Sequence, residues 1–292
     1  GIKHSRKSYY KIAPQCVDLK EKVEMKVVEF AKEHYSFNFD IVFYDVTTLY
    51  FETFEEDDLR KNGFSKDNKS QQPQILVALM VTKEGFPIAF EIFSGNTFEG
   101  HTIIPTIKNF IGRNKVKEFT VVADAAMISS ENITHLNQNE INYIVGARLG
   151  NLSIKLLGTI DEQIVRQDGK SIRIKTELGY LICSYSSVRY RKDLYEMNKQ
   201  IEKAKQVVEV PSKSRKLKFT KTNDQKLELN EELIEKTKKL LGIKGYYTSL
   251  EENIADNKTI IERYHELYKI EQAFRVSKGD LRTRPIFHFK EQ

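Results

Sequence analysis

The sequence has 292 residues, of which 40% are hydrophobic and 30% charged, a balance typical of a folded globular protein and not of a disordered chain. No apolar run approaches the roughly 20 residues of a membrane-spanning helix, so we expect no membrane partner. The net charge of +6 favours a polyanionic partner such as nucleic acid, although a lysine-rich proteome produces the same balance. Cys16 and Cys183 have neither metal-ligand spacing nor a disulfide framework, which fits a reducing cytoplasm.

Apolar residues at helical spacing predict a helix over residues 17–35, ahead of the first strand. Three runs rich in β-branched and aromatic residues follow, and the polar turns between them predict an antiparallel meander. These runs cover residues 41–51, 75–81 and 88–93.

After the meander, helices alternate with single strands. We predict a helix over 102–111, a strand over 119–123, a helix capped by Ser129 or Ser130, and a strand over 143–147. The strand at 119–123 is continuously apolar, as expected for a strand buried on both faces. A meander followed by alternating helices and parallel strands is the pattern of an RNase H-like α/β fold, whose mixed sheet is flanked by helices.

The pattern changes near residue 149, where we predict a mixed α+β insertion domain. Strand character returns at 246–250, and a last helix runs from Asp256 or Asn257 to just before Gly279. The elements predicted in the insertion are strands over 172–176 and 180–185, a charged helix over 190–208, and a helix near 231–241. The predicted domains are the first part of the core (1–148), the insertion domain (149–243), and the last strand and helix of the core (244–292).

Two aspartates interrupt or end apolar strands. Asp45 lies inside the apolar run 41–46, where a charge is costly unless it is paired or binds a metal. Asp124 ends the strand at 119–123, and ligands of open α/β sheets bind beyond the carboxyl ends of strands. The structural alternatives are an acid hydrogen-bonded to Thr47 or Thr48 for the first, and a turn residue or helix cap for the second.

A third acid, Glu271, lies on the predicted last helix. Tyr264, Glu271 and Lys278 are spaced by seven, so that they stack along one face of a continuous helix. The structural alternative is a solvated glutamate with Arg275 as its i,i+4 partner.

The three acids together favour a metal site. An RNase H-like sheet places the middle of its first strand beside the end of its fourth, and a later helix can bring a third carboxylate to the same point. Carboxylate oxygens suit Mg²⁺ or Mn²⁺, and two such ions stabilise the attacking and leaving oxygens of a phosphoryl displacement. The expected chemistry is therefore metal-dependent phosphoryl transfer.

Short blocks spread over nearly the whole chain carry a family resemblance. They are 44–51 (YDVTTLYF), 63–67 (GFSKD), 95–97 (GNT), 122–125 (VADA), 268–278 (YKIEQAFRVSK) and 284–288 (RPIFH). In this order they resemble the DDE transposases of bacterial insertion sequences, in the branch whose third acid lies in a Y-x2-R-x3-E-x6-K signature. The resemblance implies an RNase H-like core with an inserted domain. It also implies metal-dependent cleavage and transfer of DNA strands without a covalent enzyme–DNA bond.

The resemblance also implies roles for individual residues. Asp45, Asp124 and Glu271 would be catalytic ligands of Mg²⁺ or Mn²⁺, with two ions expected. Tyr264 and Lys278 match the signature residues that lie close to the DNA backbone in the family, and Arg275 can contact a phosphate with its guanidinium fork.

The implied partners are double-stranded DNA molecules, namely the terminal inverted repeats of the element and the target DNA. Synapsis of two ends predicts a homodimer on DNA. The implied location is the bacterial cytoplasm, at the nucleoid.

The chain departs from the family pattern at one signature position. Leu267 stands four residues before Glu271, where the signature has Arg, and Leu cannot contact a phosphate. Because the three acids and their flanking blocks are intact, we interpret the chain as a subgroup without that Arg and not as a decayed copy. Family members usually carry an N-terminal DNA-binding region and more C-terminal helix, so recognition of element ends is expected outside this chain.

The basic stretch 189–221 is a further candidate DNA contact. Glu196, Glu202 and Glu209 interleave with its lysines, however, which fits a solvated helix equally well.

Two other functions fit the same residues. An RNase H-like nuclease or resolvase would cut DNA without transposing it, and the absence of strand-transfer products would distinguish it. A decayed transposase that only binds DNA would fold correctly but fail to bind Mg²⁺ or Mn²⁺.

Overall fold

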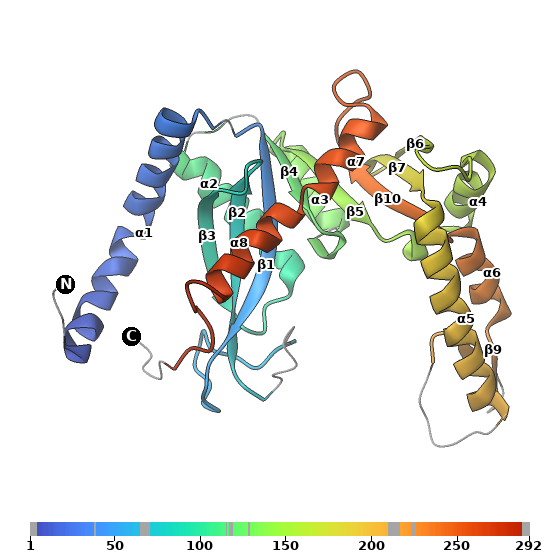
Figure 1. Cartoon of the computed structure of the whole chain (residues 1–292), viewed down its shortest axis with the longest axis horizontal. Coiled ribbons are helices and arrows are strands. Elements are labelled where there is room, and N and C mark those ends of the chain that lie inside the picture. Colours follow the sequence, from blue (N-terminus) through green and yellow to red (C-terminus); the bar gives the residue numbers. More distant parts are fainter. Residues whose placement is uncertain are drawn as a thin grey trace. The chain divides into compact units, whose positions relative to one another are not determined.

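The computed structural model describes residues 5–37, 39–64, 71–114, 116, 119–127, 129–209, 217–223 and 226–287. Figure 1 traces the chain, which forms two compact units. One unit comprises residues 1–146 with 261–292, and the other comprises residues 147–260. Within the described ranges, no helix is both long and apolar enough to cross a lipid bilayer.

The first unit is built on five strands in the order β3-β2-β1-β4-β5. They are β1 (Ile41–Tyr50), β2 (Gln74–Thr82), β3 (Pro87–Ser94), β4 (Thr120–Ala123) and β5 (Asn142–Ala147). β1, β2 and β3 pair antiparallel, whereas β4 lies parallel to both β1 and β5. This mixed sheet confirms the RNase H-like α/β fold predicted from the order of the elements.

Burial along the strands explains their sequence patterns. All four residues of β4 are buried, because this short strand lies between β1 and β5 in the sheet. β1 is buried at 42–44 and again at 46–48, and only Asp45 between them is partly exposed. The sheet thus surrounds a single acidic position with apolar and hydroxyl side chains.

Two helices follow the meander, one between β3 and β4 and the other between β4 and β5. α2 (Ile103–Asn114) buries Ile103, Ile107 and Phe110, which recur at the spacing of one helix face. α3 (Ser130–Gln138) begins after Ser129, whose hydroxyl accepts a hydrogen bond from the backbone N–H of Asn132 at 3.0 Å. Of the two predicted caps, Ser129 is therefore the one that satisfies the first turn.

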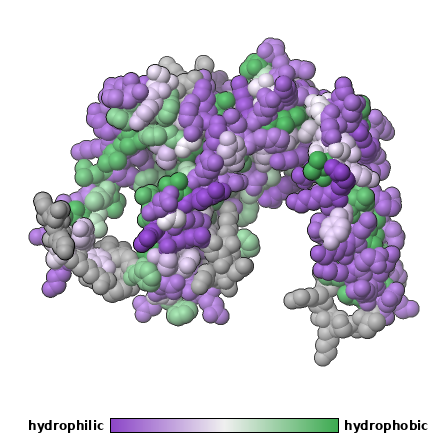
Figure 2. Space-filling view, viewed as in Figure 1, coloured by the Kyte–Doolittle hydropathy of each residue, from purple (hydrophilic) through white to green (hydrophobic). Residues whose placement is uncertain are grey.

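The N-terminal helix is longer than predicted. α1 (Arg6–Tyr35) begins 11 residues before the expected start at residue 17, and it contains Pro14. Ser5 caps it by accepting a hydrogen bond from the N–H of Ser8 at 3.3 Å. Its first half is exposed, so no buried stripe marks this part of the helix in the sequence. Hydrophobic side chains show along α1 on the otherwise largely hydrophilic face in Figure 2.

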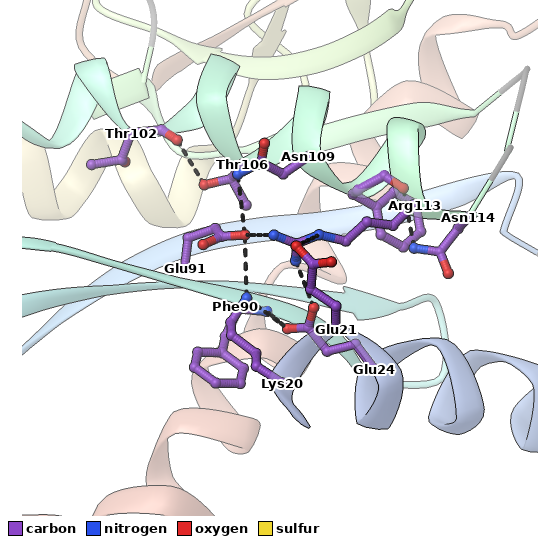
Figure 3. A network of polar contacts seen from close by, with 11 residues as sticks. Lys20, Glu21, Glu24, Phe90, Glu91, Thr102, Thr106, Asn109, Arg113 and Asn114 are labelled. Carbon is purple, nitrogen blue, oxygen red and sulfur yellow. Dashed lines mark hydrogen bonds and ion pairs between the residues drawn. The ribbon is translucent and has the colours of Figure 1, made fainter. Parts of the chain in front are cut away.

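An ion-pair network fastens α1 to the sheet (Figure 3). Arg113 at the end of α2 reaches Glu24 of α1 at 2.7 Å and Glu91 of β3 at 3.0 Å. Lys20 of α1 lies 3.2 Å from both of these carboxylates. Glu24 also accepts the backbone N–H of Phe90 at 3.1 Å, so that α1 satisfies a hydrogen-bond donor of the edge strand β3.

The second unit has its own sheet and core. β10 (Ile243–Thr248), β7 (Gly179–Tyr185) and β6 (Ser171–Thr176) follow one another as antiparallel strands. A core of Met197, Ala204, Phe219, Ile234 and Leu241 joins its helices to a hairpin. The remaining elements are α4 (Ile154–Gln163), α5 (Ser187–Glu209), the hairpin β8 (Thr220–Asn223) and β9 (Lys226–Leu229), and α6 (Glu231–Lys239).

The sequence predicted most of this second unit but not α4, and it placed the strand of β10 three residues too late, at 246–250. Residues 210–216 of the basic stretch 189–221 lie outside the described residues. The division into core segments 1–148 and 244–292 around an insertion at 149–243 stays a prediction.

The last predicted helix is two helices, α7 (Asn257–His265) and α8 (Tyr268–Lys278). The N–H of Leu267 bonds the carbonyl of Tyr264, and the N–H of Ile270 bonds that of Leu267, at 3.1 and 3.2 Å. These i to i+3 bonds tighten the chain into a 3₁₀-like turn between the helices. The prediction of one continuous helix was therefore wrong at this turn.

Candidate active site

Asp45 occupies the middle of β1, between the buried Tyr44 and Val46. Its Oδ1 accepts a hydrogen bond from the backbone N–H of Val46 at 2.7 Å. Tyr44 turns its hydroxyl to Thr102 at 2.6 Å, and burial raises the pKa of this phenol well above its ordinary value. Tyr44 therefore stays neutral, and Asp45 is the acidic side chain at this point of the strand.

Asp124 is the first residue after β4 and is exposed. In the parallel pairing of β1 with β4, Tyr44 lies opposite Ala123, and each acid directly follows one member of this pair, Asp45 inside β1 and Asp124 just beyond the end of β4. Neighbouring strands are about 5 Å apart. The fold thus brings these two predicted acids together, as the RNase H-like topology led us to expect.

Tyr264, near the end of α7, connects that helix to Asp124. Its hydroxyl donates a hydrogen bond to Oδ1 of Asp124 at 3.0 Å, across 140 residues of sequence. The same Oδ1 accepts the backbone N–H of Ala125 at 2.7 Å. Tyr264 is only 7% exposed, so the residue expected at the DNA backbone has a partner inside the protein.

Gly146 of β5 makes room for this contact. Ala123 lies opposite Val145 in the pairing of β4 with β5, and Asp124 and Gly146 directly follow these two residues. A Cβ at Gly146 would lie 2.6 Å from the Tyr264 hydroxyl and 3.1 Å from the backbone nitrogen of Ala125. Sequence reasoning did not single out Gly146, although a glycine inside a strand signals close approach of another group.

Glu271 lies in the first turn of α8 and is exposed. α8 packs against β1 and β2 (Figure 1) and buries Ile270 and Phe274. Among the residues that the structure describes, no three His, Cys, Asp or Glu side chains are placed to hold one metal ion. The structure therefore groups Asp45 with Asp124 but does not add Glu271 to a three-acid cluster.

The other predicted DNA contacts lie further along α8. Arg275 is exposed and Lys278 partly exposed, both in the last turn of that helix. Tyr264 belongs to α7, so these residues do not share one continuous helix with it. Leu267, at the position of the signature Arg, lies in the turn between α7 and α8 and is partly buried.

Lys269 holds the start of α8 in place, which the sequence did not indicate. Its Nζ donates to the backbone carbonyl of Lys83 at 2.6 Å and to Glu266 at 3.0 Å. Gly85, in the turn between β2 and β3, has a φ of 87° and lies against the side chain of Lys269. These contacts fix the helix that carries Glu271 at the β2–β3 turn.

Two of the resemblance blocks, 63–67 and 95–97, are joined through Gln74. The side-chain amide of Gln74 donates to the carbonyls of Phe64 and Gly95, each at 3.0 Å. A Cβ at Gly95 would lie 2.0 Å from the carbonyl oxygen of Gln74, so only glycine fits there. Ser65, Lys66 and Asp67 of block 63–67 lie outside the described residues.

The closing block pairs with the end of β1. The N–H of Ile286 bonds the carbonyl of Tyr50 at 3.0 Å, and the carbonyl of Ile286 accepts the N–H of Glu52 at 2.9 Å. His288, the last residue of this block, lies outside the described residues.

Comparison with known families gives one match over most of the chain. A family model described as a transposase DDE domain matches residues 37–288, which include all three predicted acids. No curated protein matches the chain.

Solved structures similar to this chain share little of its sequence. The piggyBac transposase in a synaptic complex with hairpin DNA is 11% identical, with a TM-score of 0.37, over 84% of this chain and 56% of that chain. The Mos1 transposase in a paired-end complex with the left transposon end is 12% identical, with a TM-score of 0.26, over 43% of this chain and 40% of that chain. A pre-cleavage Mos1 transpososome is 11% identical, with a TM-score of 0.26, over 43% of this chain and 41% of that chain. The chain spans about half the length of the piggyBac chain and less of the Mos1 chains.

Proposed function

Because the chain belongs to the family of transposase DDE domains, we propose that it is a transposase catalytic core that cuts and transfers DNA strands at the ends of a mobile insertion element. The observation that supports this most directly is that Asp45 and Asp124 directly follow Tyr44 and Ala123, which lie opposite each other on two parallel strands. Two carboxylates at such a point repel each other unless a cation lies between them.

Members of this family generally use divalent metal ions. The donor chemistry fits such an ion, because Asp45 and Asp124 offer hard carboxylate oxygens of the kind that Mg²⁺ and Mn²⁺ prefer. We propose that these two residues, with Glu271 as the third acid, would hold two Mg²⁺ or Mn²⁺ ions. When bound, such ions stabilise the attacking and leaving oxygens of an in-line phosphoryl displacement.

The chain's own residues would orient the DNA and supply charge. Arg275 and Lys278 lie on the same helix as Glu271, and we propose that they contact backbone phosphates beside the acids. Tyr264 was expected to do the same, but its hydroxyl is already donated to Asp124. Positioning of the phosphodiester and preorganised charge are the main protein contributions to this class of reaction.

The proposed partners are double-stranded DNA molecules, both the terminal inverted repeats and the target. We further propose a homodimer on DNA, since transfer requires two ends, and a location at the nucleoid of a bacterial cytoplasm. Residues 149–243 would form the insertion between the two segments of the catalytic core.

Cleavage of supercoiled plasmid in the presence of Mn²⁺ tests the function. We expect the wild-type chain to nick the plasmid and Asp124→Asn to lose roughly a hundredfold or more of this activity, because a metal ligand is lost. The matched control is Asp40→Asn, which removes an exposed acid just before β1.

A wild-type chain that neither nicks plasmid nor gains thermal stability from Mn²⁺ would contradict the proposal and favour a protein that only binds DNA. Equal nicking by Asp124→Asn would contradict the assigned residue. Nicking without strand-transfer products on DNA carrying the element ends would instead indicate a nuclease.

A further inference from the structure

The contact between Tyr264 and Asp124 differs from the contact expected of a DNA-binding residue. A side chain that meets a DNA phosphate needs its polar atom at the surface, but Tyr264 is 7% exposed. Its hydroxyl lies 3.0 Å from Oδ1 of Asp124 and donates a hydrogen bond to it. The phenol is thus directed at the acid and not at solvent.

Two donors meet on one oxygen of this acid. Oδ1 of Asp124 accepts from the N–H of Ala125 at 2.7 Å and from the Tyr264 hydroxyl at 3.0 Å. Among the residues that the structure describes, no donor reaches Oδ2 of Asp124 in the same way. Two bonds to one oxygen fix the rotation of the carboxyl group, which leaves the second oxygen as the one offered to a cation.

The strand beside Asp124 is shaped around these two donors. The nearest atoms to a Cβ built on Gly146 are the Tyr264 hydroxyl at 2.6 Å, and the Cβ and backbone nitrogen of Ala125, both at 3.1 Å. The space that a side chain at Gly146 would fill is therefore occupied by the same two groups that hold Asp124. A single methyl group at this position would disturb both donors together.

We propose that Tyr264 is a positioning residue, which acts on strand cleavage by orienting Asp124 for its metal ion, and that Gly146 provides the space for this contact. The inference rests on the proposed function of the acids. Hydrogen bonds that orient a metal ligand typically change metal affinity or activity by about 10- to 100-fold when they are removed.

The decisive variant is Tyr264→Phe, which removes one hydroxyl and keeps the buried ring. We expect the dissociation constant for Mn²⁺, measured by electron paramagnetic resonance on the protein alone, to rise about tenfold. The Mn²⁺ concentration for half-maximal plasmid nicking should rise in parallel. Binding of a random 30-base-pair duplex without metal should stay unchanged, because the hydroxyl does not face DNA.

The matched control is Tyr143→Phe. Tyr143 is a buried tyrosine of β5, the strand beside β4, and its hydroxyl is hydrogen-bonded with the side chain of Asn137. We expect this variant to keep the Mn²⁺ affinity and the nicking of the wild type. A thermal melt of each variant separates a changed site from a protein that no longer folds.

Gly146→Ala gives a second, independent test, because it perturbs the contact from the other side. It should weaken Mn²⁺ binding in the same direction, and adding Tyr264→Phe to it should have less effect than Tyr264→Phe has alone. Additive effects of the two substitutions would overturn the shared contact.

The possible outcomes distinguish the inference from the function on which it rests. If the wild-type chain binds Mn²⁺ and nicks DNA but Tyr264→Phe matches it in both, the positioning role is wrong and the function stands. Weaker metal-free DNA binding with an unchanged Mn²⁺ dependence would make Tyr264 a phosphate contact. A wild-type chain without Mn²⁺ binding would overturn both.

Discussion

At the scale of single residues, the first unit concentrates negative charge where its sheet is most apolar. Asp45 is flanked along β1 by residues that are almost fully buried, and Asp124 follows a strand with no exposed residue. Like charges at neighbouring strand positions destabilise a fold, and active sites commonly accept such a cost. The acids should therefore weaken the metal-free protein.

Asp45→Asn tests this cost. Without metal, the variant should be more stable than the wild type by about 1 kcal/mol, because the repulsion with Asp124 is removed and the amide oxygen can still accept the Val46 N–H. The measurement is a urea or thermal melt in the presence of a chelator, and Asp40→Asn, outside the site, should show no gain. A less stable Asp45→Asn protein would show that the carboxylate serves the fold.

The sequence could predict the two aspartates because each has a local signature, a charge inside or directly after an apolar strand. It could not predict the bond from Tyr264 to Asp124, because the two residues lie 140 positions apart and no local pattern links them. The role of Gly146 was also hidden, since it depends on the two groups that occupy the place of a side chain.

At the scale of elements, α1 is held by charge as well as by apolar packing. Arg113 has an 18% exposed side chain and contacts carboxylates from α1 and β3, including Glu24, whose side chain is 8% exposed. Ion pairs shielded from water to this degree interact more strongly than surface pairs, and removing one partner leaves the other unsatisfied. Lys20 would then be the cation left beside Glu24 and Glu91 in this network.

Arg113→Met should therefore loosen α1 and lower the free energy of unfolding by about 2 kcal/mol. Hydrogen exchange should rise in α1 and at Phe90 of β3, whose N–H bonds Glu24. The control is Lys26→Met on the same helix, which removes only an exposed pair with Glu29 and should leave stability unchanged. Equal effects of the two substitutions would show that the network does not hold the helix.

The elements that sequence periodicity predicted correctly are those with a buried face. The strands of the first sheet and α2, α3, α5 and α6 are of this kind. The exposed start of α1 has no such face, and α4 was missed altogether. The turn between α7 and α8 was missed because its residues keep helical spacing, and only the hydrogen-bond pattern distinguishes it.

At the scale of the whole molecule, the net charge of +6 suits a polyanion but does not say where it binds. We propose that part of the binding surface for DNA is formed by Arg275 and Lys278, on the helix that carries Glu271. If each of them meets one phosphate, each releases counterions when DNA binds.

Arg275→Ala and Lys278→Ala should each weaken binding of duplex DNA and reduce the slope of log Kd against log salt concentration by about 1. Fluorescence anisotropy over a series of salt concentrations measures both quantities. Lys11→Ala, an exposed change on α1, removes the same charge and should leave the slope unaltered. A slope that falls equally in all three variants would indicate diffuse attraction and not two phosphate contacts.

The turn between α7 and α8 changes the angle about the helix axis that separates Tyr264 from Glu271. In one straight helix, seven residues advance by about 700°, which brings Glu271 to within about 20° of Tyr264. Each residue of a 3₁₀ turn advances by about 120°, against about 100° in an α-helix, so three such residues change the angle between Tyr264 and Glu271 by roughly 60°. The direction in which Glu271 points from α8 is then set by the packing of Ile270 and Phe274 against the sheet, and not by its spacing from Tyr264. One residue inserted in the turn between Tyr264 and Ile270 would lengthen the spacing from Tyr264 to Glu271, but Glu271 would still point in the same direction from α8.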